Sequence, residues 1–81
     1  MPTTHFRLTE DFVVEDLMRW YHTALVGDTA VIPLPARTCC VRLVYGVNQQ
    51  VGWWPDEGRM VTMSLADALW RLRFLYNSRH V

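Results

Sequence analysis

Lysine is absent from this chain: all eight basic residues are arginine, and eight acidic residues balance them to a formal net charge of zero. Proteins that hold nucleic acid through its phosphates usually carry a surplus of positive charge, so general nucleic-acid affinity is not favoured. The four glycines stand singly, and no phosphate-binding glycine motif occurs. No apolar run approaches a membrane span, and the polar N-terminal stretch lacks the apolar segment of a signal peptide. We therefore expect a cytoplasmic protein with no membrane partner.

Cysteine is also scarce, and the only two, Cys39 and Cys40, are adjacent. Neighbours in a strand point to opposite faces, so these thiols are poorly placed to form a disulfide or share a metal ion. His5, His22 and His80 are too widely spaced to complete a zinc site. A cysteine nucleophile also needs an adjacent histidine and an orienting group, and no such arrangement is visible. The sequence therefore predicts no metal, no cofactor and no catalytic residue, with a cysteine-dependent enzyme as the weakest alternative.

The first helix is predicted from a cap at Thr9 to about Leu25, with Gly27 as its stop. An ion pair between Glu15 and Arg19 is expected because these residues lie one turn apart. Its polar side includes an acidic face of Asp11, Glu15 and Asp16. The expected core face consists of Val13, Val14, Leu17, Trp20, Tyr21, Ala24 and Leu25.

The last helix, from Ser64 to Asn77, has two apolar faces where a small domain needs one. Ser64 is its expected N-cap, and Asp67 completes a short capping box. Trp70 and Phe74 lie one turn apart on the side away from the core, and such a pair near arginine is typical of a docking surface. The opposite stripe, expected in the core, consists of Leu65, Ala68, Leu69, Leu72, Leu75 and Tyr76.

Alternating apolar residues predict strands over 38–47, about 50–54 and about 59–63, joined by turns. Residues 28–37 predict a loop with one extended piece, which its prolines restrict to an edge or a break. Residues 2–8 are predicted to form either a tail or a short edge strand. Residues 1–81 are thus predicted to be a single small α+β domain, a three- to four-stranded antiparallel sheet with two helices packed on one face in a two-layer sandwich.

Trp53 and Trp54 must point to opposite faces of their strand, so one belongs to the core and the other to the open face. The sequence does not say which, and Trp54 is taken as the exposed one, beside Arg42. Four tryptophans in so short a chain are an unusually high proportion, and tryptophan and arginine carry much of the binding energy at protein interfaces.

These features predict a non-enzymatic protein-binding module. In general profile the chain resembles the small inhibitors carried by phages and mobile elements, including anti-CRISPR proteins. This resemblance implies steric blockade of another protein or of a ribonucleoprotein complex, with the acidic face imitating nucleic-acid charge. A homodimer through the last helix is one alternative, and a small nucleic-acid-binding protein using that helix is another. The predicted partner-binding residues are Trp70, Phe74, Arg73, Arg71, Asn77, Trp54 and Arg42.

Overall fold

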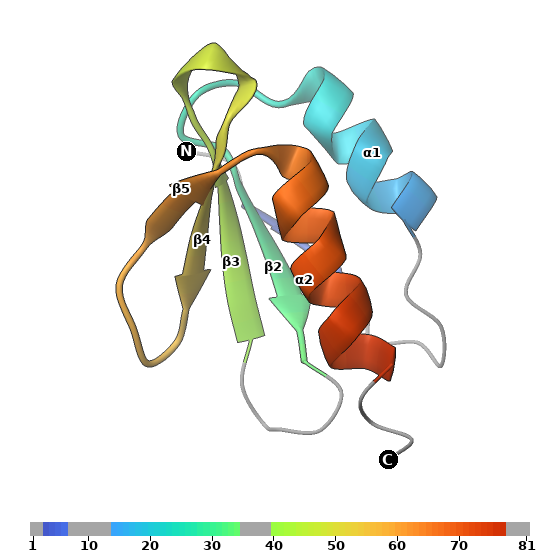
Figure 1. The fold of residues 1–81 in the computed structure, drawn as a ribbon. Helices are drawn as coiled ribbons and strands as arrows, with labels where there is room; N and C mark the ends of the chain where they lie inside the picture. Colours follow the sequence, from blue (N-terminus) through green and yellow to red (C-terminus); the bar gives the residue numbers. More distant parts are fainter. Residues whose placement is uncertain (1–2, 7–13, 35–39, 78–81) are drawn as a thin grey trace.

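The computed structural model describes residues 3–6, 14–34 and 40–77, which form one five-stranded mixed sheet and two α-helices (Figure 1). The strands lie side by side in the order β1-β2-β3-β4-β5. β1 runs parallel to β2, and each later neighbouring pair is antiparallel. The elements are β1 (Thr3–His5), α1 (Val14–Thr23), β2 (Thr29–Pro33), β3 (Cys40–Tyr45), the 3-10 turn η1 (Val47–Gln49), β4 (Val51–Pro55), β5 (Val61–Met63) and α2 (Leu65–Asn77).

The α+β class is confirmed, but the predicted number and direction of strands are wrong. The N-terminal segment pairs as a fifth strand, β1, and its parallel direction makes the sheet mixed. The proline-containing segment is also not an edge, because β2 lies between β1 and β3. Pro33 is the last residue of β2, so its missing N–H falls at the strand end and leaves the rest of the strand free to pair.

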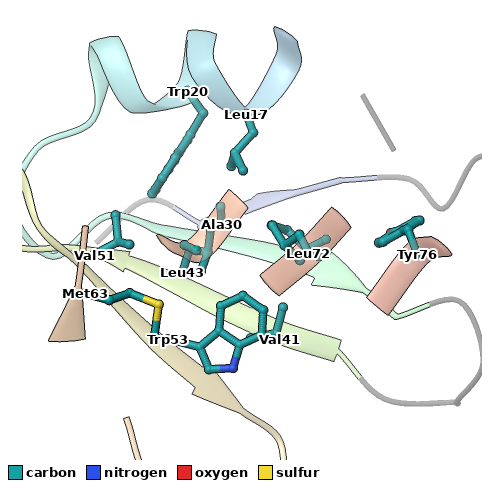
Figure 2. Close-up of a cluster of buried hydrophobic side chains, with 12 residues drawn as sticks. Leu17, Trp20, Ala30, Val41, Leu43, Val51, Trp53, Met63, Leu72 and Tyr76 are labelled. Carbon is teal, nitrogen blue, oxygen red and sulfur yellow. The ribbon is translucent and has the colours of Figure 1, made fainter. Parts of the chain in front are cut away.

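Alternate residues of the strands point toward the helices and form the core with them (Figure 2). Leu17 and Trp20 of α1 and Leu72 of α2 pack on this same sheet face, so both helices cover one side. The hydroxyl of Tyr76 donates to the carbonyl of Pro33 at 2.6 Å and fastens the end of α2 to β2. The buried core is completed by Ala30, Ile32, Val41, Leu43, Val51, Trp53, Met63 and Ala68.

The end of α1 differs from the predicted pattern. The helix ends at Thr23, and Leu25, predicted for the core, is 71% exposed. The chain turns there because the backbone N–H of Leu25 donates to a carboxylate oxygen of Asp28 at 2.9 Å and Gly27 adopts a φ of 97°. Leu25 therefore belongs to the turn and leaves the helical stripe. Thr9, Asp11 and Val13 lie outside the described residues.

The expected ion pair on α1 is also placed differently. The Arg19 guanidinium lies 3.6 Å from a carboxylate oxygen of Asp16, three residues earlier, and this replaces the predicted pair with Glu15. Both side chains are largely exposed, so water screens the pair, which contributes little to stability.

The predicted cap of α2 at Ser64 is confirmed by geometry, and its removal gives a direct test. The backbone N–H of Asp67 donates to the Ser64 hydroxyl at 3.1 Å. Ser64→Ala leaves this N–H without its side-chain acceptor, so we expect a loss of about 1 kcal/mol in the free energy of unfolding. Urea unfolding followed by far-UV circular dichroism measures it. Ser64→Asp, which keeps an acceptor, should retain most of the stability, and an equal loss in both variants would contradict the capping role.

Candidate functional site

Trp70 and Phe74 lie on the outer side of α2, as the sequence predicts, and their rings stack. Trp70 is 69% exposed and Phe74 is 60% exposed. Their ring centroids are 6.1 Å apart and the planes are inclined by only 5°. They are exposed because the inward stripe of α2 already packs on the sheet through Ala68 and Leu72, both fully buried.

A groove of about 370 Å³ runs between this side of α2 and β5. Strand β5 forms one wall with Val61, which is 49% exposed, and helix α2 forms the other. We call this region the α2 surface, defined by Val61, Asp67, Trp70, Arg71 and Phe74. It combines three exposed apolar side chains with one acidic and one basic residue.

Arg71 is held in place by a core residue. Its guanidinium carbon lies 5.7 Å from the centroid of the Trp53 ring, within cation–π range. The positive charge of Arg71, predicted for the rim of a binding surface, therefore lies above the Trp53 ring, which is only 7% exposed. Arg73 is exposed on α2, and the side chain of Asn77 lies outside the described residues.

A second aromatic surface lies on the sheet face opposite the helices, and we call it the sheet surface. It is defined by Val31, Arg42, Val44, Trp54 and Met60. Val31, Arg42 and Trp54 are register partners across three strands, and the Arg42 guanidinium carbon lies 5.9 Å from the Trp54 ring centroid. The open question about the adjacent tryptophans is thus answered, because Trp54 is 45% exposed on this face.

Gly52 makes room for part of the sheet surface. A Cβ built at Gly52 would lie 2.5 Å from the sulfur of Met60, closer than real Cβ atoms approach other atoms. Met60 therefore lies over the backbone of β4, where it is still 51% exposed. Its flexible thioether extends the apolar area around Trp54.

Asp56, in the turn after β4, contacts Arg42 of the sheet surface. One carboxylate oxygen accepts from Arg42 at 2.9 Å, and the other accepts from the backbone N–H of Cys40 at 2.9 Å. The Cys40 N–H, and to a smaller extent Arg42, lower the pKa of Asp56 below its ordinary value, against an opposing effect of desolvation. The positive charge of Arg42 is therefore locally balanced. Only a cross-strand register could have revealed this, since the residues are far apart in sequence.

The lowered pKa of Asp56 predicts a pH-dependent contribution to stability. Asp56 stabilises the fold above its ordinary pKa near 3.8, and this contribution is lost as the pH falls through the lower folded-state value. We expect Asp56→Asn to unfold at lower urea concentration than the wild type at neutral pH, and the two midpoints to converge in strong acid. Glu57→Gln, which removes an acid from the same turn, is the matched control. A constant difference at every pH would show that the charge of Asp56 is irrelevant.

The remaining candidates do not join either surface. Glu15 and Asp16 are exposed on α1, and Asp11 and Cys39 lie outside the described residues. Cys40 is half-buried in β3. In the described parts of the chain, no group of three or more His, Cys, Asp or Glu side chains could hold a metal ion. Neither described helix is both long and apolar enough to cross a bilayer.

Comparisons with protein families, curated proteins and solved structures found no match. The fold and the two surfaces therefore define only a general class, a small α+β domain with exposed aromatic and arginine side chains on opposite sides.

Proposed function

We propose that this chain is a non-enzymatic protein-binding module. The observation that supports it is the clustering of exposed rings with arginines, Trp70 and Phe74 beside Arg71 on one side and Trp54 beside Arg42 on the other. Tryptophan and arginine side chains cover much interface area at low entropic cost and dominate measured binding energies. Single exposed apolar residues are common on protein surfaces and do not indicate binding, whereas clusters of them do.

The proposed mechanism is steric blockade, as in a small inhibitor of the phage or mobile-element type. A ring inserted into a pocket of the partner supplies about 2–4 kcal/mol, and neighbouring arginines pair with acidic groups at the rim. The exposed acids Glu15 and Asp16 on α1 offer a separate negative face toward a basic partner, such as the protein component of a ribonucleoprotein complex. Blocking a surface in this way requires neither a cofactor nor a catalytic residue of this chain.

Affinity purification from the native host tests the proposal. Immobilised wild-type protein should retain a specific partner, either a foreign protein or more of the same chain. At least one of Trp70→Ala and Trp54→Ala should lose it while keeping the wild-type circular dichroism spectrum. Val47→Ala is the matched control, because Val47 is 66% exposed on η1 and belongs to neither surface. Equal retention by all variants would refute the proposal.

The nucleic-acid alternative is tested with the same protein. Binding through phosphates would appear as a mobility shift of oligonucleotides that weakens steeply with added salt. Arg42 is already paired with Asp56, which reduces the positive charge available for phosphate. We therefore expect no shift at low salt.

A further inference from the structure

We propose that the α2 surface binds a second copy of this chain, with the two β5 strands pairing antiparallel around a two-fold axis. This inference rests on the proposed function, because it names the partner of one of the two proposed docking surfaces. The joined sheets of the two copies would form one continuous sheet, with α2 of each copy on the same side of it.

The first support is the unprotected edge of the sheet. β5 is the last strand in the sheet order, and within the described residues it pairs with β4 alone. This three-residue strand, Val61, Thr62 and Met63, includes no charge and no proline, two of the devices that keep an edge from pairing. An edge of this kind is a template for another strand.

The second support is the match of side chains across the proposed axis. Val61 pairs with Trp53, and Met63 pairs with Val51, so both β5 residues point to the helix side. A half-turn centred on Thr62 places Val61 of one copy beside Met63 of the other. Both then lie under the Trp70 rings, which line the same groove. In this arrangement, the exposed apolar atoms of the groove in one copy are covered by the same atoms of the other copy.

The third support is the order of charges along α2, which favours a second copy over a foreign protein. Asp67 lies in the first turn and Arg71 one turn later, and both line the groove. A half-turn reverses the direction of α2, so the acidic end of one groove faces the basic end of the other. The acidic and basic residues of α2 therefore match those of a second copy, and a two-fold interface requires this kind of self-complementarity.

A stable dimer sets a minimum for the area that each copy must cover. An interface of the smaller standard size removes about 600 Å² from each partner. That is about a tenth of the 5740 Å² exposed by this chain. The pairing would also leave the sheet surface uncovered, and the dimer would present two Trp54–Arg42 sites on one continuous face for a foreign partner.

Charge variants at the axis test the inference by sedimentation velocity from micromolar to millimolar concentration. Wild-type protein should shift from monomer to dimer with concentration. Thr62→Lys and Thr62→Asp should each weaken the dimer about tenfold, because like charges then face each other across the axis. An equimolar mixture of the two variants should restore the dimer. Thr62 is exposed, so neither change should disturb the monomer, and Val47→Lys is the control for an added surface charge.

The tryptophan variant completes the test. Trp70→Ala should raise the dimer dissociation constant at least about 30-fold, as expected for a central anchor. A wild type that stays monomeric throughout, or charge variants that dimerise like it, would overturn the inference. If the wild type is monomeric while Trp70→Ala still loses a host protein, only the second-copy inference fails. If neither a copy nor a host protein binds any variant or the wild type, the proposed function fails as well.

Discussion

Leu72→Ala is expected to lower the free energy of unfolding by about 3–4 kcal/mol. Leu72 has no exposed surface and lies at the centre of the contact between α2 and the sheet (Figure 2). Its truncation loses the transfer energy of the removed atoms and leaves a cavity that a thin two-layer core cannot fill. A domain of this length has only about 4–12 kcal/mol of total stability, so the loss is a large fraction of it.

Urea unfolding at neutral pH, followed by circular dichroism, measures the loss. Leu25→Ala is the matched control, because Leu25 was predicted for the core but is exposed in the turn after α1. We expect this variant to differ from the wild type by less than about 0.5 kcal/mol. Equal losses at both positions would mean that Leu25 packs in the core after all.

The adjacent tryptophans are expected to give opposite results. Trp53→Ala should cost about 3–5 kcal/mol, because its ring is buried between the sheet and α2. It also removes the ring over which Arg71 lies, so it should disturb the α2 surface as well. Trp54→Ala should cost less than about 1 kcal/mol, because the Trp54 ring is half-exposed and its cation–π contact with Arg42 is weak at an exposed site.

Comparing the two variants by urea unfolding checks this assignment in one experiment. Trp53→Phe and Trp54→Phe are the conservative controls, and only the first should lose measurable stability. A larger loss at Trp54 than at Trp53 would mean that the face of β4 is assigned the wrong way round.

The sequence was sufficient where local periodicity decides the structure. The two faces of α2 follow from residue spacing alone, so the exposure of Trp70 and Phe74 could be predicted together with the burial of Leu72. The Ser64 cap likewise depends on residues only three positions apart. The alternation in β3 separated buried Val41 and Leu43 from Arg42 on the open face.

The sequence was insufficient where distant segments meet. The pairing of β1 with β2 depends on a parallel register that no local pattern encodes. Because of this pairing, the proline-containing strand β2 has a neighbour on both sides and is not an edge strand. Likewise, the partners of Arg42 and Arg71 became clear only when the strand register placed Asp56 and Trp53 beside them. Leu25 was misassigned because the Asp28 side chain closes a turn that competes with one more helical turn.

The opposite edge of the sheet has a consequence for how large any assembly can become. β1 offers only exposed Thr3, Thr4 and His5, whereas β5 offers valine, threonine and methionine. Contact between unlike edges would repeat head to tail and extend into a fibre. Contact between two β5 edges leaves no β5 edge free in the pair, so this contact alone does not repeat and stops at two chains.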